Sequence, residues 1–437
     1  MSARRTLTGV GAAAVATMLL AACSGGGGDP GGTIDGEATG SITVLTNRTD
    51  LVNDGTFEQY VSEFNETYPD VDVTVEGVND YENAIRTRLN GTSYGDVLAI
   101  PAAVSPDQYS QFFEPLGDVS EYDQYRFTAP SAFEGTLYGI ASGGNANGIV
   151  YNKQVLDEAG VTELPTTEAE WLEALQQIED NTDATPFYTN YKDGWPVSQG
   201  MGNLGAITGD PDAPNEMAHD PEPWTEGSDI YSIDSLLYES VAAGLTEDDP
   251  LTTDWETSKT ELGAGDIATM ALGSWAISQI QAAAEEAGAS ADDIGYMAWP
   301  ANVDGQQYAV IGGDYAYAIS KHSDAKAAAY AWITWFAEES GYTESEGMVS
   351  TVVDAPLPDN LSAMEDAGVE LMETNPAPDG EEGLLDEIAD ESRIDLYGSN
   401  YRQELIDVAR GAADGDKASF FADLNERWGA AVADLAG

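Results

Sequence analysis

The sequence is poor in the residues that most metal and enzyme sites use. Its 437 residues include one cysteine and two histidines, which excludes a disulfide framework and a Cys/His zinc site and leaves little for imidazole catalysis. Lysine and arginine number 16 against 78 acidic residues, a net charge of −62. Such a surface repels nucleic acids and anionic lipids. We therefore expect no nucleic-acid partner, no metal and no other cofactor.

The remaining composition is that of a folded protein. Hydrophobic residues make up 42% and charged residues 22%, unlike a disordered acidic chain. The length suggests two or three domains at about 150 residues each. The excess of acid favours adaptation to high or fluctuating salt, because carboxylates keep a protein hydrated when salt screens its charges. An ordinary acidic secreted protein is the alternative.

The N-terminus indicates export and lipid anchoring. Arg4 and Arg5 precede an apolar run that is too short for a permanent membrane span. Residues 20–23, Leu-Ala-Ala-Cys, resemble the lipobox of bacterial lipoproteins, and Cys23 is the only cysteine of the chain. We predict a signal peptide over 1–22 and a lipidated Cys23 with a Gly-rich flexible tether over 23–40. This places the protein on the extracellular face of the cell membrane.

The body after residue 40 alternates between strand and helix patterns, which predicts an α/β fold with a largely parallel sheet. The expected strands are 41–45, 71–75, 96–101, 148–151, 267–272 and 308–319, and the expected helices are 57–68, 80–90, 152–159, 167–178, 275–287, 325–337 and most of 384–435.

Two glycine motifs match known catalytic or nucleotide-binding patterns but lack the strands and helices that those patterns require around them. Residues 91–95 match G-x-S-x-G, yet a helix precedes them and a strand follows, the reverse of a nucleophile elbow. Residues 200–205 match G-x-G-x-x-G without a preceding strand or a following helix. His219 and His322 lie in polar contexts and are interpreted as surface residues.

Aromatic residues stand out at the expected ends of elements. Trp195 and Trp275 lie near loops rather than at helical spacing. The apolar C–H face of a pyranose complements the face of an aromatic ring, and carboxylates and amides suit its hydroxyls. Core packing is the alternative interpretation of these rings.

Several segments together resemble an extracellular solute-binding protein, specifically the maltose-binding-protein-like carbohydrate receptors of ABC importers. They are the lipobox with its tether, 42–50 (ITVLTNRTD), 94–98 (YGDVL), 148–153 (GIVYNK) and 265–275 (GDIATMALGSW). The resemblance implies a periplasmic-binding-protein-like α/β fold of two lobes, each a mixed, largely parallel sheet flanked by helices, with a hinge and a helical C-terminal segment. The expected lobe I is 41–142 with 309–350, and the expected lobe II is 143–308 with 351–437.

The resemblance also implies the site and the partners. A sugar is held between the lobes, which close over it, and the closed form is recognised by the membrane permease; we expect a monomer. Carried over by position, the expected ligand contacts are Asn47, Arg48, Asp50, Asn145, Asn147, Tyr188, Trp195, Trp275, Gly313, Asp314, Tyr397 and Tyr401, with Gly312 also at the return crossing. Asp96 begins a strand and is interpreted as structural. Residues 210–226, rich in proline and acid, look like an insertion.

Three functions remain open at this point. The favoured one is a lipid-anchored sugar receptor without catalysis. A receptor of the same fold for a cationic ligand, such as a polyamine, would suit the acidity. A secreted carbohydrate-active enzyme would share the aromatic rings and carboxylates.

Overall fold

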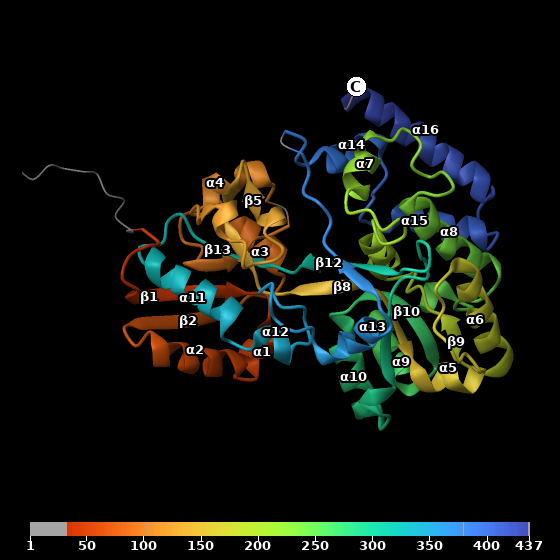
Figure 1. Cartoon of the computed structure of the whole chain (residues 1–437), viewed down its shortest axis with the longest axis horizontal. Coiled ribbons are helices and arrows are strands. Elements are labelled where there is room, and N and C mark those ends of the chain that lie inside the picture. Colours follow the sequence, from red (N-terminus) through yellow and green to blue (C-terminus); the bar gives the residue numbers. More distant parts are fainter. Residues whose placement is uncertain (1–32, 103, 379, 436–437) are drawn as a thin grey trace, which may run out of the picture.

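The computed structural model describes residues 33–102, 104–378 and 380–435, which form two lobes connected by strands at a narrow waist (Figure 1). The predicted signal peptide, Cys23 and tether residues 23–32 lie outside the described residues. Tether residues 33–40 do not all extend away from the body, because Ile34 and Ala38 pack against the hydrophobic core of lobe I. No helix in the described part of the chain has the length and apolarity to cross a membrane.

Lobe I is built on a mixed sheet of order β2-β1-β3-β13-β7, in which β1 runs parallel to β2 and β3 and β13 runs antiparallel to β3 and β7. Its elements are β1 (Gly40–Thr46), α1 (Thr49–Asn53), α2 (Thr56–Thr67), β2 (Val71–Gly77), α3 (Tyr81–Arg88), β3 (Val97–Ala99), η1 (Pro106–Gln108), α4 (Tyr109–Phe112), β4 (Gly117–Asp118), η2 (Val119–Glu121), η3 (Ala129–Ser131), β5 (Ala132–Phe133), β6 (Thr136–Leu137), β7 (Gly139–Ala141), β13 (Ala316–Ile319), α11 (Lys326–Glu338) and α12 (Tyr342–Ser345).

Lobe II is built on a second mixed sheet of order β14-β12-β8-β10-β9, with β11 also paired to β8. Its elements are β8 (Gly144–Asn152), α5 (Lys153–Ala159), α6 (Glu168–Asn181), β9 (Thr185–Phe187), η4 (Trp195–Asn203), α7 (Ala213–His219), α8 (Asp229–Ala242), η5 (Pro250–Thr252), α9 (Trp255–Ala264), β10 (Ile267–Gly273), α10 (Ala276–Ala287), η6 (Ala291–Asp293), β11 (Ile294–Met297), β12 (Tyr308–Gly313), η7 (Asp359–Leu361), α13 (Ser362–Asp366), β14 (Glu370–Met372), α14 (Leu384–Ser392), α15 (Asn400–Ala409) and α16 (Lys417–Leu435).

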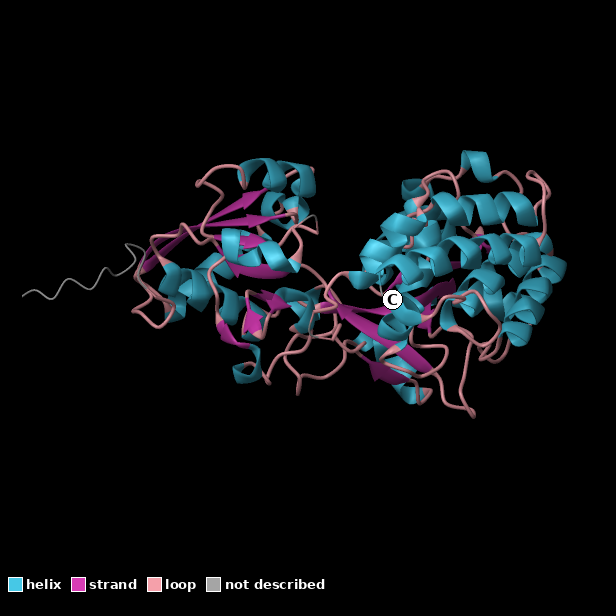
Figure 2. Cartoon of the chain, turned by 90° about the horizontal axis from the view of Figure 1, so that it is seen from above, coloured by secondary structure: helices cyan, strands magenta, loops and turns pink. Residues whose placement is uncertain are grey.

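Helices cover the sheets with apolar faces at the expected spacing. In α2 the buried side chains are Phe57, Tyr60 and Phe64, one face of a 3.6-residue repeat. Phe64 packs edge-on against Trp332 of α11, which contacts the same sheet. Lobe II is rich in helices (Figure 2), and they cover both faces of its sheet, because Val150 of β8 packs in one hydrophobic core with α9 and α10 and the neighbouring Ile149 packs in another with α6 and α16.

Local capping follows the sequence closely. Asn152 caps α5 by accepting from the backbone N–H of Val155, and the helix ends at Gly160 with a φ of 86°. Thr167 accepts from the N–H of Glu170 at the start of α6. Asp80, by contrast, precedes α3 without a side-chain bond to the helix backbone, since its carboxylate accepts from Asn83 instead.

The chain passes between the lobes where strands end. β7 closes lobe I and β8 opens lobe II, and β12 leads back to β13 through Asp314 and Tyr315. A third connection follows α12, where Val349 bridges to Gly144. The predicted strand 308–319 is therefore two strands in two sheets, and residues 309–313, expected in lobe I, belong to the lobe II sheet.

Other expectations need smaller corrections. Both sheets are mixed, but β8 runs antiparallel to β10, β11 and β12, so lobe II is less parallel than expected. The region 210–226, expected to be an insertion, carries α7 and the buried Trp224 and so packs into lobe II.

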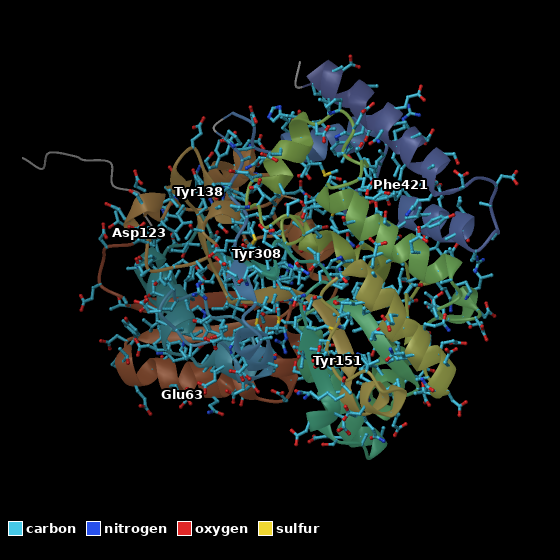
Figure 3. All side chains as sticks on the ribbon, turned by 45° about the vertical axis from the view of Figure 1, so that its right-hand side comes forward. Glu63, Asp123, Tyr138, Tyr151, Tyr308 and Phe421 are labelled. Atoms are coloured by element: carbon cyan, nitrogen blue, oxygen red, sulfur yellow. The ribbon has the colours of Figure 1, made fainter. Side chains whose placement is uncertain are left out.

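The two glycine motifs lie in connections between elements of the fold or at the end of one. Residues 91–95 connect α3 to β3, as predicted, and residues 200–205 lie at the end of η4 and beyond it. Asp96 accepts from the N–H of Thr43 and from Ser323. Both histidines are exposed. Acidic side chains such as Glu63 and Asp123 lie on the outer surface of lobe I (Figure 3).

Candidate functional site

A cavity of about 600 Å³ lies between the lobes, beside the strands that join them. Lobe I contributes the end of β1, the start of α1 and the region of α12, and lobe II contributes the start of α10. Its lining residues are Asn47, Arg48, Asp50, Ser142, Asn145, Trp275, Ser278, Gln279, Asp314, Tyr315, Tyr317, Tyr342, Glu346 and Met348.

A second cavity, of about 890 Å³, adjoins the first, since Asp314 and Tyr315 line both. It lies between the region from β3 to β5 in lobe I and the start of α14 in lobe II. We refer to the two adjoining cavities together as the interlobe groove.

Arg48 organises the lobe I wall. It follows β1 and precedes α1, and its guanidinium pairs with Asp50 at 2.6 Å and with Glu346 at 2.7 Å. It also donates to the hydroxyl of Tyr342 at 3.0 Å. Burial by itself lowers the pKa of Arg48, but the hydrogen bond and charge of its two carboxylate partners outweigh this and raise it. The same contact lowers the pKa of Asp50. The wall therefore holds fixed charges at neutral pH.

Asp314 lies at the return crossing and is exposed to both cavities. Its carboxylate accepts from the N–H of Tyr315 at 2.8 Å. Surrounding protein raises the pKa of Asp314, and the contacts with Tyr315, Arg48 and Asn145 oppose that rise. Just before it, Gly313 has no room for a side chain, because a Cβ would lie 2.7 Å from the Cβ of Phe127. The crossing thus presents the Asp314 carboxylate to the groove, next to the side-chain amide of Asn145.

Three tryptophans gather on the lobe II side. Trp195 begins η4, Trp255 begins α9 and Trp275 precedes α10. Their ring centroids lie 5.1 Å apart for Trp195 and Trp255, 5.7 Å for Trp255 and Trp275, and 5.8 Å for Trp195 and Trp275. Trp195 is 39% exposed and Trp275 lines the first cavity. The rings of Trp195 and Trp275 offer the kind of apolar aromatic face on which a pyranose stacks.

Gly273 allows Trp275 to fold back over the end of β10. A Cβ at this glycine would lie 2.6 Å from Cδ1 and Nε1 of the Trp275 indole. The neighbouring Ser274 is tied to β8, since its N–H donates to the carbonyl of Ala146 at 2.8 Å. The end of the strand therefore sets the place of the ring.

The structure brings seven of the twelve predicted ligand contacts into the cavity linings and an eighth beside them. Asn47, Arg48, Asp50, Asn145, Trp275 and Asp314 line the first cavity and Gly313 the second. Trp195 joins through the tryptophan cluster, and Gly312 precedes the crossing in β12.

The other predicted contacts lie elsewhere in lobe II. Asn147 donates to the carbonyl of Val310 at 3.2 Å. Tyr188 borders a small apolar cavity inside the lobe, and Tyr397 is 57% exposed and lines neither interlobe cavity. Tyr401 was wrongly placed at the groove, because it is 3% exposed and its hydroxyl donates to the buried Asp234.

Sequence reasoning missed Tyr342, Glu346, Ser278, Gln279 and Trp255. Ser278 and Gln279 lie within one helical turn of Trp275, and that spacing is a signal that could have found them. Trp255 follows Asp254, whose carboxylate accepts from the N–H of Thr257, so it lies at a predictable helix start. Tyr342 and Glu346 carry no comparable signal. Within the described residues, no group of three or more His, Cys, Asp or Glu is arranged to hold a metal ion.

Comparison with known proteins defines the family. The pattern described as bacterial extracellular solute-binding protein matches residues 49–343, more than half of the chain. The chain belongs to this family. Members of this family bind a solute and do not transform it, which confirms the prediction made from the resemblance of the sequence.

Individual relatives agree with this assignment. The multiple sugar-binding protein of Streptococcus mutans is 24% identical over 281 residues, which cover 61% of this chain and 64% of that protein, under two thirds of its length. A binding protein of an ABC transporter from Bifidobacterium animalis subsp. lactis, solved with mannobiose, is 34% identical with a TM-score of 0.81, over 91% of this chain and 95% of that one. A manno-oligosaccharide specific solute binding protein from the same organism, solved with mannotriose, has the same identity, coverage and TM-score.

Proposed function

We propose that this solute-binding protein captures a neutral oligosaccharide, of the manno-oligosaccharide class, in the interlobe groove and delivers it to the permease of an ABC importer. The observation that carries the proposal is the pairing of Trp275 from lobe II with the Arg48 wall of lobe I around one cavity. The relatives solved with mannobiose and mannotriose support the choice of sugar.

The two walls suit the two faces of a sugar. A pyranose presents C–H groups to an aromatic ring, and its hydroxyls both donate and accept hydrogen bonds. Arg48 supplies donors, and Asp50 and Glu346 supply acceptors. A ligand that touches both walls favours the closed arrangement of the lobes by its added contacts there.

Calorimetric titration of the mature chain tests this proposal. Mannobiose and mannotriose should bind, with maltose and raffinose as comparison sugars. Chromatography of the recovered ligand should return it intact, whereas a carbohydrate-active enzyme would shorten it. Absence of binding by every manno-oligosaccharide contradicts the proposed ligand class.

A cationic ligand is the second candidate, because the first cavity is lined by Asp50, Asp314 and Glu346 but only one cation, Arg48. Binding of spermidine would weaken steeply with added salt, since salt screens charge attraction. Binding of a neutral sugar would change little. Titration at two salt concentrations therefore separates the two ligands.

We further propose that Cys23 carries the lipid that holds the protein at the outer face of the membrane. The expected result of Cys23→Ser is release from the membrane fraction with unchanged sugar affinity. Retention of the variant in the membrane fraction would contradict the anchor.

A further inference from the structure

Of the three clustered tryptophans only Trp275 lines an interlobe cavity. Beside it, Trp195 is 39% exposed, whereas Trp255 is partly buried. Its ring plane makes an angle of 77° with Trp195 and of 63° with Trp275. The Lys259 ammonium lies over the Trp255 ring, 5.2 Å from the centroid, and pairs with Glu256 at 2.7 Å. A face covered by a cation is unavailable to a sugar. Trp255 is thus held between a cation on one face and the edges of its two tryptophan neighbours.

The backbone fixes the positions of these rings. The carbonyl of Asp193 accepts from the N–H of Trp195 at 2.9 Å, and the carboxylate of Asp193 accepts from the N–H of Trp255. The starts of η4 and α9 are thereby linked through one residue. On the other side, Gly273 leaves the space that the Trp275 indole occupies. The three rings form one packed unit rather than three independent side chains.

The result is a pair of inclined rings, one lining the first cavity and the other partly exposed beside it. The rings of Trp195 and Trp275 are tilted by 42° and their centroids lie 5.8 Å apart. That separation is comparable to the length of one pyranose unit. Two successive rings of an oligosaccharide, turned relative to each other about the glycosidic bond, can each meet one indole. A monosaccharide meets only one.

We propose that Trp255 is a positioning residue that holds Trp195 and Trp275 at this inclination and so makes the site selective for two or more linked pyranoses over a single one. This inference rests on the proposed function, because it assumes a sugar ligand. Without Trp255, each indole loses its perpendicular neighbour and can rotate into the vacated space. The disaccharide then loses its second stacking contact, and the monosaccharide keeps its single one.

Titration of Trp255→Ala and Trp255→Phe with mannose, mannobiose and mannotriose tests the proposal. In Trp255→Ala we expect affinity for both oligosaccharides to fall about tenfold, as for a truncated aromatic anchor, with a much smaller change for mannose. Trp255→Phe should recover most of the selectivity. The circular dichroism couplet of the closely spaced indoles should weaken in Trp255→Ala. Leu251→Ala, in the same loop and 61% exposed, is the matched control and should change nothing.

Gly273→Ala provides an independent variant if Trp255→Ala fails to fold. Its Cβ displaces the Trp275 indole while Trp255 stays in place, and the same loss of selectivity is expected. An unchanged ratio of mannobiose to mannose affinity in folded Trp255→Ala or Gly273→Ala overturns the inference and leaves the proposed function intact. If the unaltered protein binds none of these sugars, the proposed function itself fails.

Discussion

Arg48 donates to the hydroxyl of Tyr342 at 3.0 Å, although 294 positions separate the two residues in the chain. The contact joins the loop after β1 to α12, and Glu346 adds an ion pair to the same guanidinium. Lobe I therefore presents a polar wall whose side chains hold one another in place. Preorganisation of this kind lowers the entropy lost on binding.

Arg48→Lys should weaken oligosaccharide binding by about 1.5–3 kcal/mol, the range for hydrogen bonds to a charged group, because lysine keeps the charge but lacks the guanidinium fork. Titration calorimetry measures the change. Arg88→Lys is the control, since Arg88 pairs with Glu76 on the surface of lobe I and lines neither interlobe cavity. Equal affinity in both variants would remove Arg48 from the site.

Trp275→Ala should reduce sugar affinity by about 1.5–3 kcal/mol through loss of a stacking ring, with the fold retained. Tyr397→Ala should leave affinity unchanged, because this exposed ring lines neither interlobe cavity. The pair of titrations separates a ligand contact from a surface aromatic. A loss of affinity in Tyr397→Ala, with none in Trp275→Ala, would instead favour Tyr397 as the ligand contact that the sequence predicted.

Asp314→Asn should change stability in a pH-dependent way. The raised pKa of Asp314 means that its ionised form is disfavoured in the folded state. Ionisation of Asp314 therefore lowers the free energy of unfolding. This loss is absent below the ordinary carboxyl pKa of about 4 and is complete once the pH has risen through the folded-state pKa. The variant should therefore melt at a higher temperature than the unaltered protein at pH 7, and at the same temperature at pH 3.5. If the two melting temperatures differed by the same amount at pH 3.5 and pH 7, Asp314 would not have a raised pKa in the folded protein.

Asp234→Ala should destabilise lobe II by about 3–5 kcal/mol, because it leaves the buried Arg402 without its charge partner. The two side chains are 0% and 1% exposed and pair at 2.9 Å. Guanidinium unfolding measures the change. Asp423→Ala removes the exposed partner of Arg427 and should change stability by less than about 1 kcal/mol.

The stability of the whole protein should rise with molar potassium chloride. The net charge of −62 produces repulsion between carboxylates, and added salt screens it. Thermal melting at increasing salt measures the effect. A melting temperature indifferent to salt would contradict adaptation of this surface to saline conditions.

The sequence by itself determined the local elements and the class of the fold. The apolar spacing in α2, the Asn152 cap and the Gly160 stop depend on residues within a few positions, so periodicity and capping rules recover them. Trp275 was expected at the site from the family resemblance and from its place just after a strand, and the structure places it in the lining of the first cavity.

Only the tertiary structure decided which side chains share the groove. Tyr342 and Glu346 meet Arg48 through the packing of α12, and neither has a local pattern that announces a site. Tyr401 points instead into the core of lobe II, where Asp234 satisfies its hydroxyl. The reason is physical: element patterns arise from neighbours along the chain, whereas a cavity wall arises from the packing of segments hundreds of positions apart.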